Sequence, residues 1–207
     1  MQFERPTWDE SFMLQAILTA TRSSCLIRQC GATLVRDKRI IASGYNGAPQ
    51  NIRTCLENGV CFYQSLAHQD SEKGLGLYSD LKEQRKNFCR VIHAEENAVN
   101  QCSRYGPVAD GSTMYITNFP CPHCVTSVII PNGIVEVVVW KDYLRNLLLT
   151  MDEYLVSKSL LDEAKIKTRK LDLSKNRMRE IFELTFLVGD RSEYRFNPDQ
   201  MLIRLEP

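Results

Sequence analysis

The segments Cys89-Arg-Val-Ile-His93-Ala-Glu95 and Pro120-Cys121-Pro-His-Cys124 decide how this chain is organised. One imidazole and two thiolates leave the fourth position of a tetrahedral zinc ion open. That arrangement is typical of a catalytic site, because four protein ligands normally close a structural zinc site. Glu95 follows the histidine by two residues, where it can move protons for a zinc-activated water without serving as a ligand. The sequence therefore predicts a catalytic zinc at His93, Cys121 and Cys124, with Glu95 as the general acid and base.

Each half of this pattern is common by itself. A Cys-x-x-Cys pair also occurs in redox proteins and zinc knuckles, and His-Ala-Glu on a helix is usually a solvated turn. Occurring together and in this order, the two halves favour catalysis. The alternative is a zinc-stabilised binding module without chemistry, which has no need of an acid and base at Glu95.

Composition narrows the classes of partner. A chain of 207 residues buries a substantial single core, and its net charge of +1 gives no general attraction to nucleic acid or membranes. No apolar signal region follows Met1, and no apolar run reaches transmembrane length. We therefore expect a cytoplasmic protein with neither a membrane nor a nucleic-acid partner. Eight cysteines in a reducing compartment indicate metal ligands and free thiols rather than disulfides.

Helical and strand patterns alternate along the chain. A capping box at Thr7 and Glu10 begins the first helix, Pro122 suits the first turn of another, and a β-branched run ending at Trp140 is typical of a strand covered on both faces. The predicted helices are 8–22, a segment starting at 93, a segment starting near 122, and 151–164. The predicted strands are 32–35, 39–43, 113–117, 134–140 and 166–171, the first two forming an antiparallel hairpin. This order predicts an α/β fold, a three-layer α/β/α sandwich whose mixed sheet has helices on both faces.

The segment Gly44-Tyr45-Asn46-Gly47-Ala48-Pro49 follows the predicted hairpin. Its two glycines and proline suit a loop that brings the backbone close to a ligand. The alternative is a simple turn at Asn46-Gly47.

An insertion at about residues 51–89 has weak periodicity, and a loop of this length needs something that holds it in place. Four thiolates, or three together with His68, would complete a closed tetrahedral zinc site there. We therefore predict a second, structural zinc ion whose ligands are Cys25, Cys55, Cys61 and Cys89. The alternative is that these cysteines are buried free thiols, the role that we assign to Cys30 and Cys102.

These segments together resemble the deoxycytidylate (dCMP) deaminases of the cytidine deaminase superfamily. The resemblance covers approximately Trp8 to Leu171. Its matching segments are Ser23-Ser24-Cys25, Gly31 to Val35, Gly44 to Pro49, Cys89 to Glu95, Pro120 to Cys124 and Ser159 to Ala164. Two departures are Cys30, which replaces the usual valine, and an insertion between Cys61 and Cys89 that is longer than in compact members.

This resemblance implies a cytidine-deaminase-type fold and zinc-dependent hydrolysis of dCMP to dUMP, which feeds thymidylate synthesis. Glu95 would take a proton from the attacking water, protonate N3 of cytosine and later protonate the departing ammonia. Asn46, with Tyr45 and Gly47 beside it, would contact the sugar. A guanidinium suits the 5′-phosphate, and the candidates are Arg22, Arg28 and Arg90.

The resemblance also sets the domains and partners. Residues 1–173 would form the zinc-dependent deaminase domain, and residues 174–207 an extension without an assignable role that forms a hairpin or a helix. We expect a homohexamer regulated by dCTP and dTTP, with Val128, Ile129 and Ile130 in a subunit contact. A tRNA adenosine deaminase or single-stranded DNA editor would share the zinc motifs, but it would need a basic surface for nucleic acid.

Overall fold

The computed structural model describes residues 5–62, 89–140 and 151–189. The chain divides into two compact units, Thr7–Asp172 and a second that joins Met1–Pro6 to Leu173–Pro207. The described part of the second unit contains helix α8 (Lys175–Gly189), so the extension forms a helix rather than a hairpin. Within the described ranges, no helix has the length and apolar character needed to cross a bilayer. The division into a deaminase domain and an extension of separate role stays a prediction.

The larger unit contains one mixed sheet with the strand order β2-β1-β3-β4-β5. β1 (Gly31–Arg36) is antiparallel to both β2 (Arg39–Tyr45) and β3 (Thr113–Ile116), and the β1–β2 pair is the predicted hairpin. β4 (Glu136–Trp140) and β5 (Lys167–Leu171) continue from β3 in parallel. Parallel neighbours need crossover connections, and the helices between these strands supply them. The predicted mixed sheet is therefore confirmed.

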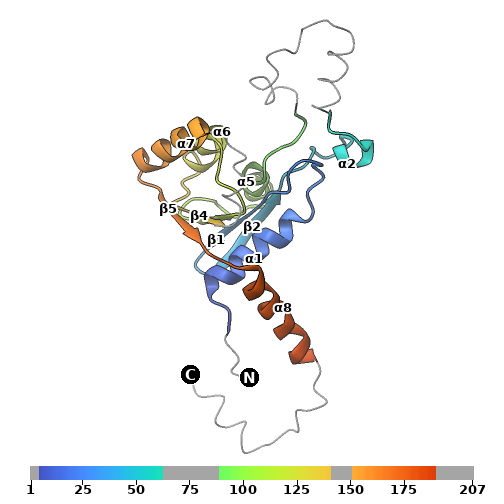
Figure 1. The fold of residues 1–207 in the computed structure, drawn as a ribbon. Helices are drawn as coiled ribbons and strands as arrows, with labels where there is room; N and C mark the ends of the chain where they lie inside the picture. The colour runs from blue at the N-terminus through green and yellow to red at the C-terminus, as the bar shows by residue number, and fades with distance from the viewer. Residues whose placement is uncertain (1–4, 63–88, 141–150, 190–207) are drawn as a thin grey trace, which may run out of the picture. The chain divides into compact units, whose positions relative to one another are not determined.

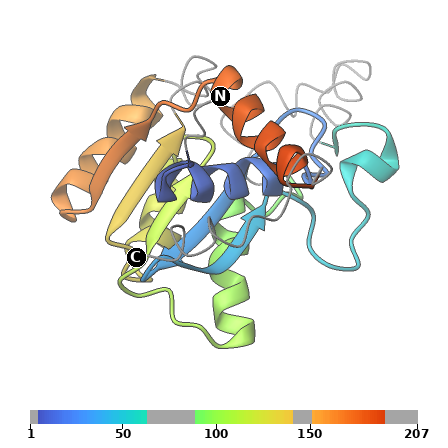
Figure 2. The ribbon, with the colours of Figure 1, turned by 90° about the horizontal axis from the view of Figure 1, so that it is seen from below.

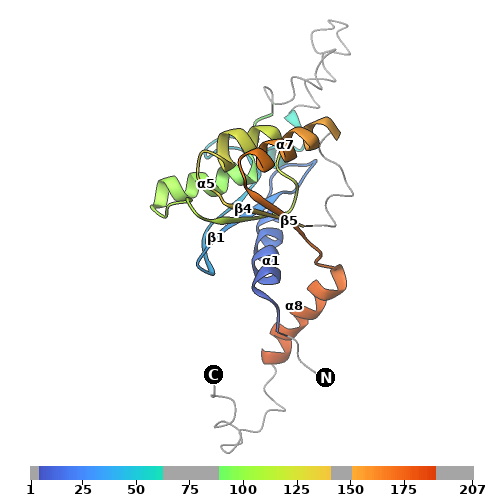
Figure 3. The same ribbon diagram turned by 90° about the vertical axis from the view of Figure 1, so that its left-hand side faces the viewer.

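Helices cover both faces of the sheet, so the three-layer α/β/α arrangement is confirmed (Figure 1). The predicted capping box of Thr7 and Glu10 is present and begins α1 (Trp8–Ala20). Figure 2 shows α1 lying across the strands of one face. α5 (Ala94–Tyr105) and α7 (Met151–Glu163) lie on the side opposite α1, as Figure 3 shows.

The main core lies between the sheet and the layer that contains α5 and α7. Alternate residues of a strand face the same side, and those of the three central strands that face this layer are buried: Ala32, Leu34, Met114, Ile116, Val137 and Val139. Tyr115 and Val138 are buried on the opposite face. The central strands are thus covered on both sides, as the β-branched run predicted.

Two glycines allow helices to approach the sheet closely. A Cβ on Gly31 would lie 2.7 Å from the amide nitrogen of Ala20 in α1. A Cβ on Gly44 would collide with the carbonyl oxygen of Ala94 and the amide nitrogen of Ala98 in α5. The prediction that the glycine at position 44 serves close approach to a ligand is therefore wrong, because the backbone that it admits is that of α5.

The second metal-bearing helix is short. α6 (Pro122–Cys124) has its proline in the first turn, as predicted, and continues as the π-helical turn η1 (Val125–Ile129). Val128 and Ile129 are 4% and 0% exposed and belong to the main core. Their predicted place in a subunit contact is therefore wrong. Ile130 is 37% exposed.

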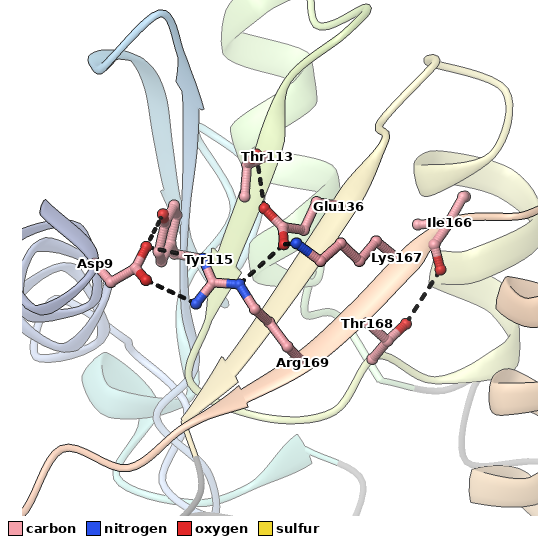
Figure 4. A network of polar contacts seen from close by, with 8 residues as sticks. All are labelled: Asp9, Thr113, Tyr115, Glu136, Ile166, Lys167, Thr168 and Arg169. Carbon is pink, nitrogen blue, oxygen red and sulfur yellow. Dashed lines mark hydrogen bonds and ion pairs between the residues drawn. The ribbon is translucent and has the colours of Figure 1, made fainter.

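A charged network crosses β3, β4 and β5 on the face that carries α1 (Figure 4). Asp9 of α1 accepts hydrogen bonds from Tyr115 Oη at 2.6 Å and from Arg169 Nη1 and Nη2 at 2.7 and 2.8 Å. Arg169 Nε donates to Glu136 at 2.9 Å, and Lys167 Nζ lies 3.1 Å from the same carboxylate. The hydrogen bond from Arg169 holds the pKa of Asp9 below its ordinary value. The network therefore ties the start of α1 to the edge strand β5.

We predict that Gly44→Ala lowers the free energy of unfolding by about 3 kcal/mol or more, because the added methyl group meets backbone atoms that cannot rotate away. Gly59→Ala is the control. Gly59 has a φ of +70° with open space around it, so alanine there costs only about 1–2 kcal/mol of backbone strain. Chemical denaturation measures both variants, and equal costs would contradict the close approach of α5.

We predict that Arg169→Met lowers the free energy of unfolding by about 1–2 kcal/mol at pH 7, because it leaves two partly buried carboxylates without their shared donor. Lys158→Met, which breaks an exposed 2.8 Å pair with Asp162, should cost less than about 0.5 kcal/mol. The lowered pKa of Asp9 stabilises the fold above about pH 4, the ordinary range of that group, and this stability is lost as pH falls through the folded value. The difference between wild type and Arg169→Met in urea unfolding should therefore shrink at pH 3, and a constant difference would contradict the role of the ion pair.

Candidate metal centre

The predicted metal ligands lie at the starts of two helices. His93 is the N-cap residue of α5, with an extended backbone (φ −72°, ψ 158°), and Cys121 is the N-cap residue of α6 (φ −76°, ψ 162°). Cys124 is the last residue of α6. An N-cap side chain usually accepts a hydrogen bond from its own helix, but neither of these side chains does so. Both are available for binding to a metal ion.

The structure brings the three ligand atoms together. The imidazole of His93, through Nδ1, lies 3.2 Å from Cys124 Sγ and 3.6 Å from Cys121 Sγ. The three ligand atoms lie within 4.8 Å of one another. Zn–S and Zn–N bonds of about 2.3 and 2.0–2.1 Å with tetrahedral angles place nitrogen and sulfur about 3.6 Å apart. The geometry therefore fits one zinc ion, with Nδ1 as the nitrogen ligand.

The protonation of these groups follows from their proximity. The hydrogen bond from Cys124, together with the imidazole of His93, lowers the pKa of Cys121 to about 3. The same hydrogen bond raises the pKa of Cys124, so the two thiols share one proton. The hydrogen bond to Cys121 raises the pKa of His93 to about 9. Because a metal ion must displace these protons, binding weakens as pH falls.

Glu95 occupies the first turn of α5 and is 5% exposed. Burial raises the pKa of its carboxyl group, and its side chain is within hydrogen-bonding reach of Cys124. A carboxyl group with a raised pKa beside a metal ion can both accept and return a proton near neutral pH. The structure therefore places a buried carboxyl group with a raised pKa beside the three predicted ligands.

The loop that follows β2 is joined directly to the segment before His93. Gly47 and Ile92 exchange two backbone hydrogen bonds of 2.9 and 3.2 Å. Asn46 is 6% exposed, and its Oδ1 accepts a hydrogen bond from the amide of Cys30 at 2.7 Å, while its Nδ2 donates to the carbonyl oxygen of Arg28 at 2.9 Å. This loop is therefore more than an isolated turn, because it links the segment before β1 to the metal ligands.

The three arginines proposed for phosphate lie in different settings. Arg22 is exposed, and Arg28 is half-buried in the loop that Asn46 holds. The guanidinium of Arg90 lies 3.6 Å from the ring centroid of Phe62. Burial, reinforced by the charge of Glu95, raises the pKa of the Cys30 thiol to about 12, and Arg28 opposes this shift. Arg28 is therefore within electrostatic reach of the site.

The cysteines predicted for a second zinc ion do not form a comparable cluster. Among the residues that the structure describes, His93, Cys121 and Cys124 are the one group of three or more metal-binding side chains within 4.8 Å of one another. His68 lies outside the described residues. Cys25, Cys55 and Cys61 are buried and Cys89 is half-buried, and none of these four cysteines forms a disulfide.

Sequence reasoning missed two residues that organise the site. Asn97 Nδ2 donates a hydrogen bond to the carbonyl oxygen of Tyr45 at 2.6 Å. Ser23 Oγ donates to the carbonyl oxygen of Asn46 at 2.8 Å. The signal at Asn97 was its place one turn after His93 and next to Ala98 and Val99 of the buried face, since a polar residue near a buried face needs a partner.

These observations define a three-layer α/β domain with a buried carboxyl group beside a His/Cys/Cys cluster that fits zinc. Residues 6–141 match the family described as the cytidine and deoxycytidylate deaminase zinc-binding region, and the chain belongs to this family. The resemblance drawn from the sequence is therefore confirmed.

Named relatives support this assignment. ComE operon protein 2 of Bacillus subtilis is 38% identical over 140 residues, which are 68% of this chain and 62% of that protein. The deoxycytidylate deaminase of Saccharomyces cerevisiae is 36% identical over 139 residues, 67% of this chain and 39% of the yeast enzyme. The deoxycytidylate deaminase of Mycobacterium phage D29 is 35% identical over 138 residues, 67% of this chain and 98% of the phage enzyme. The match thus spans under two thirds of the first two relatives.

The fold also matches a solved structure. The dCMP deaminase of cyanophage S-TIM5, in complex with dCMP and dUMP, superposes with a TM-score of 0.56 at 23% identity. The superposition covers 82% of this chain and 100% of the phage chain. This likeness confirms the cytidine-deaminase-type fold.

We predict that Cys124→Ser lowers the zinc content by one ion per chain, because a neutral hydroxyl replaces a thiolate in a set of only three protein ligands. Cys102→Ala is the control, since Cys102 is a buried thiol of α5 that belongs to the apolar core. This variant should keep its zinc. Metal analysis of the purified proteins measures both, and full zinc content in Cys124→Ser would contradict the ligand set.

Proposed function

We propose that this chain hydrolyses the 4-amino group of deoxycytidine monophosphate, producing dUMP and ammonia for thymidylate synthesis. The observation that carries the proposal is a buried carboxyl group with a raised pKa, Glu95, beside one imidazole and two thiols. Relatives of this chain at 35–36% identity are named deoxycytidylate deaminases. The solved structure with the same fold holds dCMP and dUMP.

His93, Cys121 and Cys124 would hold zinc, which lowers the pKa of a water molecule so that hydroxide is available near neutral pH. Glu95 takes the proton of the attacking water and passes it to N3 of the pyrimidine. The carboxylate of Glu95 then takes the proton of the hydroxyl group added at C4 and delivers it to the 4-amino group, which departs as ammonia while the C4 carbonyl of dUMP forms. Burial of Glu95 keeps its pKa raised, so that one group performs both transfers.

Substrate contacts are assigned to the loop around Asn46. Asn46 would bind the deoxyribose, with Tyr45 and Gly47 shaping the same wall, because the Gly47–Ile92 pair joins this loop to the metal ligands. Of the three arginines, Arg28 is the best supported contact for the 5′-phosphate. Asn46 holds its carbonyl oxygen, and its charge reaches the Cys30 thiol near Glu95.

We predict that the purified zinc enzyme deaminates dCMP faster than deoxycytidine, dCTP or an RNA hairpin, as followed by the release of ammonia from each compound. Glu95→Gln should keep its zinc and lose about two to four orders of magnitude in kcat, the usual contribution of an acid and base. Glu96→Gln is the matched control, because Glu96 is half-buried in the same helical turn.

Each other outcome has a definite meaning. Unchanged kcat in zinc-loaded Glu95→Gln would remove the proposed mechanism. Preferred action on the RNA hairpin would point to a tRNA adenosine deaminase or another nucleobase deaminase. A zinc-loaded chain inactive on all four compounds would point to a zinc-stabilised binding module.

A second, structural zinc ion is also proposed, bound by Cys25, Cys55, Cys61 and Cys89, with His68 as a substitute ligand. Its support is that the chain neighbours of these cysteines meet in pairs. The amide of Leu56 donates to the carbonyl oxygen of Ser24 at 3.2 Å, next to Cys55 and Cys25. The guanidinium of Arg90 stacks on Phe62, next to Cys89 and Cys61.

We predict about two zinc ions per wild-type chain and about one in Cys55→Ser, because loss of one thiolate opens a closed tetrahedral site. The variant should lose thermal stability before it loses catalytic competence. A single zinc ion in the purified, active wild-type enzyme would contradict the second site.

Assembly, regulation and location belong to the same proposal. We propose a homohexamer whose rate responds to dCTP and dTTP, supported by the resemblance to dCMP deaminases, and a location in the cytoplasm. Light scattering tests the hexamer, and kinetics with each triphosphate test the regulation. A monomer, or a rate indifferent to both compounds, would contradict the respective part.

A further inference from the structure

The first turn of α5 carries both His93 and Glu95, yet no side chain caps it. An N-cap side chain usually stabilises a helix by about 1 kcal/mol and fixes where the helix begins. In α5 this position belongs to His93, whose Nδ1 faces the two cysteine sulfur atoms. Other contacts must therefore hold the first turn in place.

The close contact at Gly44 sets the distance between α5 and β2. Ala94 and Ala98 meet the backbone there, where Gly44 has no side chain. The Gly47–Ile92 pair holds the chain just before His93. Rotation of α5 about its own axis would still move the carboxyl group of Glu95 relative to the metal ligands.

Asn97 supplies the missing directional contact. Its Nδ2 donates to the carbonyl oxygen of Tyr45 at 2.6 Å, the shortest bond that α5 makes with β2 among the described residues. Its backbone amide donates to the carbonyl oxygen of His93 at 2.9 Å. Asn97 thus connects β2 to His93 through two hydrogen bonds, one from its side chain and one from its backbone.

We propose that Asn97 is a positioning residue, whose side-chain amide fixes the rotation of α5 on β2 and thereby the places of Glu95 and the His93 imidazole. A misplacement of about 1 Å at a reacting group costs about 10²-fold in rate. Only the kinetic part of the inference rests on the proposed function, because the geometry of the metal centre can be measured without a substrate.

Gln101 offers a matched comparison. It lies one turn after Asn97 on the same side of α5, and its Oε1 accepts a hydrogen bond from the amide of Ser43 in β2 at 3.4 Å. Gln101→Glu keeps this acceptor, whereas Asn97→Asp removes the donor that binds Tyr45. The two variants make the same change from amide to acid on one helix face.

The experiment compares these variants as full-length, metal-loaded proteins. Asn97→Asp should lower kcat for dCMP roughly 10²-fold with KM changed by less than about threefold, because positioning acts on the transition state. Its cobalt(II)-substituted form should show shifted d–d absorption bands, since those bands report the geometry around the metal. Gln101→Glu should match wild type in kcat and in cobalt spectrum.

Several results would overturn the inference. These are an unchanged kcat and cobalt spectrum in Asn97→Asp, or equal losses in both variants. If Asn97→Asp fails to fold, Asn97→Ala takes its place, because alanine favours the helix while removing the donor. If the wild type does not deaminate dCMP, the proposed function has failed. The cobalt spectra then decide alone, a shift confined to the Asn97 variant supporting the positioning role and identical spectra ending it.

Discussion

The backbone contact between α5 and β2 at Gly44 is the constraint on which the metal centre depends. A side chain at this position would push away the helix whose first turn carries a metal ligand and the acid and base. The same strand continues into Asn46 and Gly47, which bind the backbone of Arg28, Cys30 and Ile92. The end of β2 therefore contacts the start of α5, the segment 28–30 and Ile92. Gly44 is needed because it allows α5 to pack closely against the strand.

The electrostatics of the site follow from the placement of two helix starts. The positive end of a helix dipole favours negative groups nearby, and the starts of α5 and α6 bring Glu95 and Cys121 to such ends. Burial works against charge in the same place and raises the pKa of Glu95. A bound metal ion would relieve this competition, because it would replace protons of the thiols and the imidazole.

The predictions that were wrong share one cause. Gly44 was assigned to a ligand, and Val128 and Ile129 to a subunit contact, because local composition shows that a position is special without showing what lies opposite it. Gly44 faces α5, and the two apolar residues face the core of their own chain. Likewise, the strand predicted at 166–171 gave no sign that Arg169 binds Asp9 from the start of the chain.

The sequence by itself determined the order of helices and strands and the mixed sheet, and it singled out His93, Cys121, Cys124 and Glu95, which the structure brings together. These features are local, since periodicity, caps and short motifs act within a few residues. Only the tertiary structure decided which nitrogen of His93 faces the cysteines, and that Asn97 binds Tyr45. Such contacts join residues far apart in the chain. A single sequence does not specify these pairs, because many polar groups could accept a hydrogen bond from each donor.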